Sequence, residues 1–156
     1  MDERRFTEAV GQYQKLLFHI AYTMLRDQQD CADAVQEALY LAWRGRGKLR
    51  DESAAKAWLC RILVNTCNSV LRRRKRIRFV EMEDIEAPPQ VDNLELHGVI
   101  TKLKQDLRLP IVMFYMEGFS IEEIGKILQV PTGTVKSRMV RARKILGTML
   151  SEEDFA

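Results

Sequence analysis

Residues 120–146 read SIEEIGKILQVPTGTVKSRMVRARKIL, and this segment constrains the fold more than any other part of the chain. Ser120 and Glu123 have the spacing of a capping box, which predicts that a short helix begins after Ser120. Pro131 suits the first turn of a second helix, because that turn does not need the N–H that proline lacks. The segment therefore predicts two helices separated by the short break QVP, which is the arrangement of a helix-turn-helix.

The second of these helices is predicted to have two unlike faces. On a wheel of about 100° per residue, the apolar side carries Val135, Met139, Ala142, Leu146 and Leu150. The opposite side carries Lys136, Ser137, Val140, Arg141, Lys144 and Thr148, with Arg138 and Arg143 on the flanks. Residues 131–146 contain five cations and no anion. We expect the apolar face to pack and the basic face to enter the major groove of DNA.

Contacts with the DNA backbone are expected beside that groove-facing surface. The flanking arginines would reach phosphates, and Thr134 with the free amides at the helix start could hold another. The alternative is an amphipathic surface helix with a solvated basic face.

The net charge of +3 is unevenly distributed along the chain. Residues 1–78 contain 16 basic residues (Lys and Arg) and 9 acidic residues (Asp and Glu). Residues 79–95 contain no basic and 6 acidic residues, and residues 96–156 contain 9 basic and 7 acidic residues. The net charges are thus +7, −6 and +2, which sum to +3. Two basic segments on either side of an acidic connector favour nucleic acid as a partner over a small-molecule substrate.

The acidic connector also divides the helical patterns. Pro88 and Pro89 disfavour helix, so residues 79–93 are predicted to be an extended linker, a packed loop being the alternative. Apolar stripes before it predict three long helices, the third with Ser53 as N-cap and continuing into RRRKRIR. Four shorter helices are predicted after it. We expect an all-α fold of two small domains, residues 1–78 and 94–156, joined by a flexible acidic linker, with the helix-turn-helix in the second.

Other features limit the choice of protein class. The odd number of cysteines, Cys31, Cys60 and Cys67, without a close pairing motif favours buried reduced thiols over disulfides or a metal site. No apolar stretch approaches the roughly 20 residues needed to cross a bilayer. The charged N-terminal sequence lacks the apolar core of a signal peptide, so we expect a cytoplasmic protein without a cofactor or metal.

Three segments together resemble the sigma factors of bacterial RNA polymerase. Residues 120–146 are similar to the helix-turn-helix that reads the promoter −35 element. RDQQDCADAVQEALYLAW resembles the helix that binds the polymerase clamp, and AWLCRILVNTCNSVLRRRKR resembles the helix that binds the −10 element. Their order, their spacing and the length of the chain match the extracytoplasmic-function (ECF) subfamily of the sigma-70 family.

The resemblance implies a role for each segment. Residues 1–78 would bind the polymerase clamp and the −10 element, residues 94–156 would read the −35 element as duplex, and the linker would run through the polymerase toward the RNA exit path. Core RNA polymerase and promoter DNA would be the partners. An anti-sigma factor, often membrane-anchored in this family, would regulate the protein, and no small-molecule substrate or catalytic activity is implied.

The resemblance also implies roles for single residues. The polymerase-binding residues would be Asp33, Gln36, Glu37 and Tyr40. The −35 element would be bound by Thr134, Lys136, Ser137, Arg138, Val140, Arg141, Arg143 and Lys144. The −10 element would be bound by Leu49, Trp58, Asn65, Arg72, Arg73, Arg74, Lys75 and Arg76, with the loop GRGKLRDES of residues 45–53 capturing an extruded base. Trp58 is interpreted either as a core anchor or as a wedge between the strands.

The sequence also departs from the family pattern. Leu49 and Cys60 stand where aromatic residues are common, which suggests a narrow promoter repertoire. Two other protein classes stay open. A dimeric helix-turn-helix repressor or activator is disfavoured by the clamp-like first domain. An enzyme with a DNA-binding tail is disfavoured because the sequence has no nucleophile–base pair, phosphate-cradling glycine loop or metal cluster.

Overall fold

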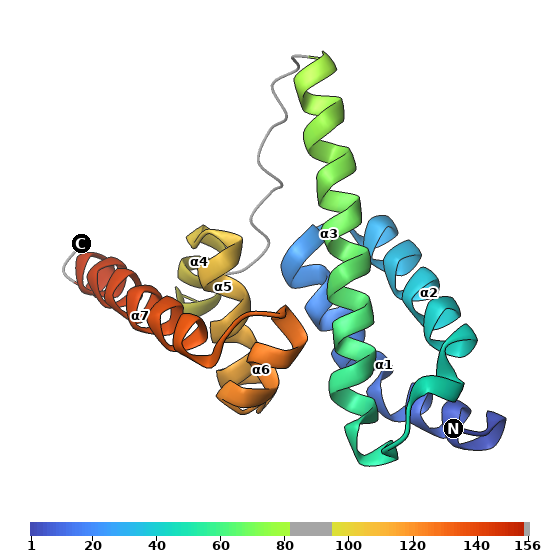
Figure 1. Cartoon of the computed structure of the whole chain (residues 1–156). Helices are drawn as coiled ribbons and strands as arrows, with labels where there is room; N and C mark the ends of the chain where they lie inside the picture. Colours follow the sequence, from blue (N-terminus) through green and yellow to red (C-terminus); the bar gives the residue numbers. More distant parts are fainter. Residues whose placement is uncertain (82–94, 155–156) are drawn as a thin grey trace. The chain divides into compact units, whose positions relative to one another are not determined.

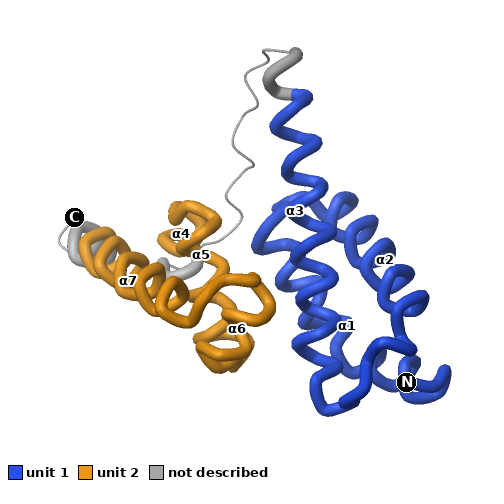
Figure 2. The backbone as a smooth tube through the Cα atoms, viewed as in Figure 1, with its two compact units in different colours: residues 1–86 blue, residues 87–156 orange. Residues whose placement is uncertain are grey.

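The computed structural model describes residues 1–81 and 95–154, with the side chains of residues 1–77 and 98–149. Helices are the regular structure of these residues, and no strand occurs among them. The chain divides into two compact units, residues 1–86 and 87–156 (Figure 2). The predicted all-α fold is thereby confirmed. Most of the predicted linker, residues 82–93, lies outside the described residues.

Unit 1 is a bundle of three long helices that pack against one another in pairs (Figure 1). Its core includes the fully buried side chains of Leu17, Ile20 and Leu63. The last part of α3 extends past the ends of α1 and α2. The elements of unit 1 are α1 (Glu3–Leu25), α2 (Gln28–Arg44), the 3-10 turns η1 (Arg46–Lys48) and η2 (Glu52–Ala54), and α3 (Ala55–Glu81).

Both ends of α3 differ from the sequence prediction. Ser53 is not its N-cap, because Asp51 caps the preceding η2 and accepts hydrogen bonds from the backbone N–H and the hydroxyl of Ser53, at 3.0 and 2.7 Å. The helix also continues to Glu81, so residues 79–81 of the predicted linker are helical. Arginine and lysine are good helix formers, which accounts for the continuation through the basic run.

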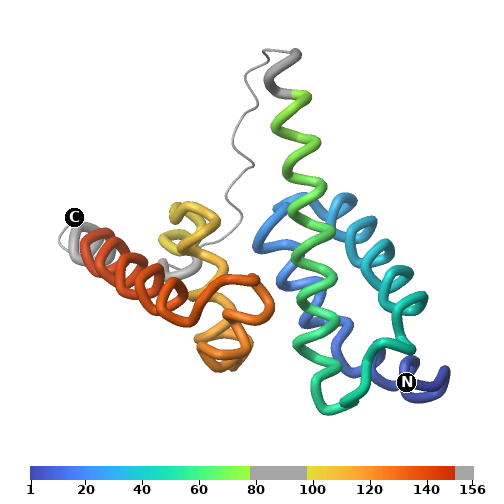
Figure 3. Tube along the Cα trace, in the orientation of Figure 1, coloured from blue at the N-terminus to red at the C-terminus, as the bar shows by residue number. Residues whose placement is uncertain are grey.

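Unit 2 is built around its last helix, which α4, α5 and α6 all contact (Figure 3). Its fully buried side chains include Phe119, Met113 and Ile124. The elements of unit 2 are α4 (Glu95–Lys102), α5 (Gln105–Ile111), the π-helical turn η3 (Val112–Met116), α6 (Ile121–Leu128) and α7 (Thr132–Asp154). None of the helices in the described parts of either unit is long and apolar enough to cross a membrane.

The break between the first two helices of unit 2 does not coincide with the proline of this segment. The break falls around Leu103 and Lys104, and Pro110 lies inside α5. The buried side chain of Arg108 donates from Nη1 to the carbonyl oxygens of Thr101 and Leu103, at 3.3 and 3.2 Å. Because a cationic side chain satisfies carbonyls at the C-terminus of α4, that helix can end there without a glycine.

Candidate nucleic-acid interface

The predicted helix-turn-helix is formed by α6 and α7. The hydroxyl of Ser120 accepts a hydrogen bond from the N–H of Glu123 at 3.1 Å, and the Glu123 carboxylate accepts one from the N–H of Ser120 at 3.0 Å. The predicted capping box is thus confirmed. Pro131 directly precedes α7 instead of occupying its first turn, and its carbonyl oxygen accepts from the N–H of Val135 at 3.2 Å.

The turn between these helices depends on close backbone packing. Gln129 ends α6 in the left-handed conformation, with φ of 59°. A Cβ atom added to Gly125 would lie 3.0 Å from the carbonyl oxygen of Val130, closer than real Cβ atoms ordinarily come. This carbonyl oxygen belongs to the turn that leads to α7. A larger residue at this position would therefore require the backbone of the turn to shift.

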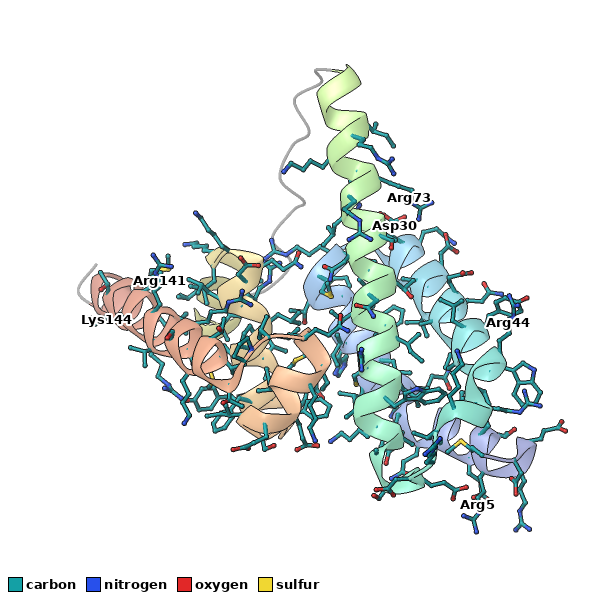
Figure 4. All side chains as sticks on the ribbon, in the orientation of Figure 1. Arg5, Asp30, Arg44, Arg73, Arg141 and Lys144 are labelled. Atoms are coloured by element: carbon teal, nitrogen blue, oxygen red, sulfur yellow. The ribbon has the colours of Figure 1, made fainter. Side chains whose placement is uncertain are left out.

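The two-faced character predicted for α7 agrees with the exposure of its side chains. Val135, Met139, Ala142 and Leu146 are buried, whereas Leu150 lies outside the residues whose side chains are described. Figure 4 shows Arg141 and Lys144 projecting from this helix. The exposed residues of the other face are Lys136, Ser137, Val140, Arg141, Lys144 and Thr148. We call this surface the α7 outer face.

Residues on the flanks of α7 are in different surroundings. Thr134 and Arg138 are half-buried, whereas Arg143 is exposed. The Nε of Arg143 donates to the hydroxyl of Tyr115 at 2.8 Å, and its Cζ lies 5.6 Å from the centre of the Tyr115 ring. Tyr115 is 59% exposed and belongs to η3. Sequence reasoning did not find Tyr115, because a residue 28 positions earlier gives no sign of contact with α7.

The four predicted polymerase-binding residues lie together on one surface of α2. Asp33, Gln36, Glu37 and Tyr40 are all exposed, while the intervening Ala34, Val35 and Ala38 are buried against the bundle. Arg44 lies one turn beyond Tyr40, and its guanidinium carbon is 5.8 Å from the Tyr40 ring centre. Sequence reasoning did not select Leu41, which is 42% exposed. We call the four predicted residues the α2 outer face.

The loop of residues 45–53 connects α2 to α3 through its two 3-10 turns. Leu49 is half-buried at the end of η1, and Asn65 is exposed on α3. Trp58 is half-buried, and its Cζ2 would lie 3.9 Å from a Cβ atom added to Gly45, which places its ring beside the start of the loop. These three predicted residues are all accessible at least in part.

The five cations predicted to bind DNA at the end of α3 are not equivalent. Arg72, Arg73, Lys75 and Arg76 are exposed, and Figure 4 shows Arg73 projecting from the helix. The half-buried Arg74 donates from Nη1 to the carbonyl oxygen of Leu25 at 2.9 Å and forms an ion pair with Asp30. It thereby ties α3 to the end of α1 and to the first turn of α2. Its interactions within the bundle set Arg74 apart from its four neighbours.

The three cysteines are free and buried in unit 1. Burial raises the pKa of the Cys31 thiol to about 11 and that of the Cys67 thiol to about 12. Thiols with such pKa values stay protonated at neutral pH, which makes them poor nucleophiles and poor metal ligands.

Comparison with known protein families matches both units separately. Residues 9–77 match the family Sigma-70 region 2, and residues 93–146 match the family Sigma-70, region 4. The chain is 34% identical to the RNA polymerase sigma-H factor of Pseudomonas aeruginosa over 96% of its own length and 88% of that protein. It is 33% identical to the ECF RNA polymerase sigma factor SigM of Mycobacterium tuberculosis over 96% of its length and 79% of that protein.

Solved structures of similar fold include two protein complexes. The sigma factor RpoE of Bartonella quintana, solved in complex with the anti-sigma factor NepR, matches with a TM-score of 0.81 and 29% identity over 94% of this chain and 96% of that one. CnrH, in complex with the cytosolic domain of CnrY, shares the fold with a TM-score of 0.72 at 24% identity over 97% and 90% of the two chains. Because both regions match in order and the relatives cover nearly the entire chain, the chain belongs to the ECF subfamily of the sigma-70 family of RNA polymerase sigma factors.

Proposed function

We propose that the protein is an alternative sigma factor that binds core RNA polymerase and directs transcription from a specific set of promoters. The observation that carries the proposal is the exposure of the α7 outer face on a capped helix-turn-helix whose opposite face is packed. The width of an α-helix fits the major groove, and a basic face with serine and valine among the cations supplies both charge and base-edge contacts.

Residues 94–156 read the −35 element in this proposal. Arg141 and Lys144 on the α7 outer face reach base edges, with Lys136, Ser137 and Val140 beside them. Thr134, Arg138 and Arg143 contact phosphates on the flanks, where they fix the position of the helix without reading sequence.

Residues 1–78 carry two interactions in the proposal. The α2 outer face binds the polymerase clamp, and its combination of carboxylates, an amide and the large exposed ring of Tyr40 suits a protein partner. The loop of residues 45–53, with Leu49, Trp58 and Asn65, receives a base of the −10 element. Arg72, Arg73, Lys75 and Arg76 neutralise promoter phosphates. Residues 82–93, which follow α3, connect the two functional segments.

An anti-sigma factor is the second protein partner that we propose. One solved structure of similar fold holds the sigma factor RpoE together with the anti-sigma factor NepR, which supports this proposal. The protein acts in the cytoplasm, where the polymerase works, and contributes promoter choice while the polymerase carries out catalysis.

A dimeric helix-turn-helix repressor is the competing function, and the match of residues 9–77 to Sigma-70 region 2 argues against it. Gel filtration with and without core RNA polymerase separates the two. A sigma factor elutes with core polymerase, and the mixture makes transcripts with a defined start only on promoters that carry matching −10 and −35 elements. If the protein elutes as a dimer, does not bind core polymerase and binds duplex DNA by itself, it is the repressor instead.

A further inference from the structure

The start of the 45–53 loop is anchored on the bundle through Arg46. The guanidinium carbon of Arg46 lies 3.6 Å from the centre of the Trp43 ring, and its Nη1 donates to the carbonyl oxygen of Trp43 at 2.8 Å. The Trp43 ring in turn meets the ring of Phe6 edge-on, with 5.3 Å between their centres. Phe6 is buried in the second turn of α1. The start of the loop is therefore stacked on the ring of Trp43, which in turn contacts Phe6 of α1.

The end of the loop is anchored on the same helix through a different contact. Arg5, next to Phe6 in sequence, forms an ion pair between its Nη1 and the carboxylate of Glu52 in η2 (Figure 4 labels Arg5). The backbone N–H of Arg5 donates to the capping carboxylate of Asp2 at 2.9 Å, so the turn that carries Arg5 is itself held in place. The end of the loop thus contacts Arg5 of α1 directly, and the start of the loop reaches the neighbouring Phe6 through the ring of Trp43.

A connecting loop with few regular hydrogen bonds has many conformations available, and each contact at its ends removes some of them. The ion pair between Arg5 and Glu52 is exposed to solvent, so it contributes little to the free energy of unfolding of the whole unit. Such a pair still shifts the balance among loop conformations that differ little in free energy.

We propose that Arg5 is a positioning residue for promoter recognition, which sets the conformation of the 45–53 loop through Glu52 and thereby tunes the preference for the −10 base. Arg5 acts without touching DNA. The inference rests on the proposed role of the loop as the reader of a −10 base, and it adds the start of α1 to the parts of the chain that determine promoter choice.

Charge reversal at both ends of the ion pair tests this proposal with the full chain in holoenzyme. The variants are Arg5→Glu, Glu52→Arg and the double variant, and transcription is measured on promoters that differ at single −10 positions. Each single variant should compress the ratio between the best and the worst −10 base by about 2- to 5-fold, and the double variant should restore it. Affinity for core polymerase should stay unchanged in all three.

Arg4→Glu is the matched control for this experiment. Arg4 is the neighbouring arginine, is largely exposed, and pairs only along its own helix with Glu8 at 3.4 Å among the ion pairs of the described residues. The control makes the same change in charge without altering the contact with the loop, so its ratio of −10 preferences should equal that of the unchanged protein.

Two outcomes would overturn the proposal, and a loop exchange separates it from the proposed function. If Arg5→Glu lowers transcription from every promoter by one factor and Glu52→Arg does not rescue it, Arg5 acts through its own charge on DNA. If exchanging residues 45–53 for the loop of another ECF sigma factor changes the −10 ranking but the ion-pair variants do not, the inference about Arg5 alone fails. If the exchange leaves the ranking unchanged, the loop does not read the base and its proposed function fails.

Discussion

The Nε of Arg143 donates a hydrogen bond to the hydroxyl of Tyr115, so a flank of α7 is tied to the π-helical turn η3. This bond engages the inner edge of the guanidinium and leaves the two terminal amino groups for other acceptors. The pairing suggests that Tyr115 holds Arg143 in the orientation in which it meets a phosphate.

Tyr115→Phe removes this hydrogen bond and keeps the aromatic ring. We expect the variant to bind all −35 sequences more weakly by one common factor of a few fold, because a less ordered Arg143 loses phosphate contact without affecting base reading. Holoenzyme binding to a set of −35 variants measures this factor. Unchanged binding by Tyr115→Phe, with Arg143→Ala still impaired, would show that Arg143 needs no support from Tyr115.

Arg141 and Arg143 are expected to differ in what they recognise. Arg141→Ala should relax specificity at one −35 position by about 1–3 kcal/mol, which is the usual value of a bidentate contact with a base. Arg143→Ala should preserve the ratio between matched and mismatched sites and reduce the slope of log affinity against log salt by roughly 1. Transcription or binding on −35 variants at several salt concentrations tests both. A common loss on every sequence from both substitutions would mean that α7 is oriented differently on DNA.

The α2 outer face is expected to bind core polymerase. Replacing Gln36 and Glu37 with lysine reverses the charge of this surface, and both side chains are exposed, so the helix should be retained. The double variant should bind core polymerase more weakly in a pull-down while its circular dichroism spectrum stays normal. If core polymerase captures the variant and the unchanged protein equally, the α2 outer face does not bind the polymerase clamp.

Arg74 and Arg73 are adjacent cations with different expected roles. Arg74→Ala removes the bonds to Leu25 and Asp30, and we expect the free energy of unfolding of unit 1 to fall by roughly 1–2 kcal/mol. Arg73→Ala, the matched control, should leave thermal melting almost unchanged and reduce the salt dependence of promoter binding. Melting curves and salt titrations of both variants distinguish the roles. Equal stability of the two variants would contradict a structural role for Arg74.

Buried thiols make unit 1 sensitive to alkaline pH. The pKa of Cys31 and Cys67 is raised from the model-compound value of 9.0 to about 11 and about 12 because burial disfavours the thiolate. Their contribution to stability is therefore complete below about pH 9 and is lost as the pH rises toward 11 and 12. The free energy of unfolding should fall less steeply between pH 9 and 10.5 when both residues are alanine, as urea titrations would measure. If the free energy of unfolding falls equally steeply with pH in the unchanged protein and in the double alanine variant, this account is wrong.

The sequence predicted those features that rest on local or periodic patterns. The capping box at Ser120 and the packed side of α7 follow from spacing along one helix, and both are confirmed. The break between α4 and α5 could not be predicted from the sequence, because the contact that satisfies the end of α4 comes from the buried Arg108 in the next helix. Pairings between distant segments, such as that of Arg5 with Glu52, leave no periodic signal in a single sequence.

Among the site residues, too, those that follow a local pattern could be predicted and those that depend on distant contacts could not. The exposure of the α2 outer face could be read from its alternation with buried alanines and Val35. The run of cations at the end of α3 could not be sorted in this way, because all its members look alike in sequence. Only the bundle brings Leu25 and Asp30 to Arg74 and separates it from the others.

The burial of all three cysteines has a practical consequence for fluorescence experiments. Maleimide dyes react with thiolates that they can reach, and the native thiols lie inside unit 1. A cysteine introduced at an exposed position of α7, such as Ser137→Cys, would be labelled selectively at neutral pH without first removing the native ones. The unaltered protein is thus a ready background for attaching one dye beside the DNA-facing surface, where it would report promoter capture by single holoenzymes as a change in emitted light.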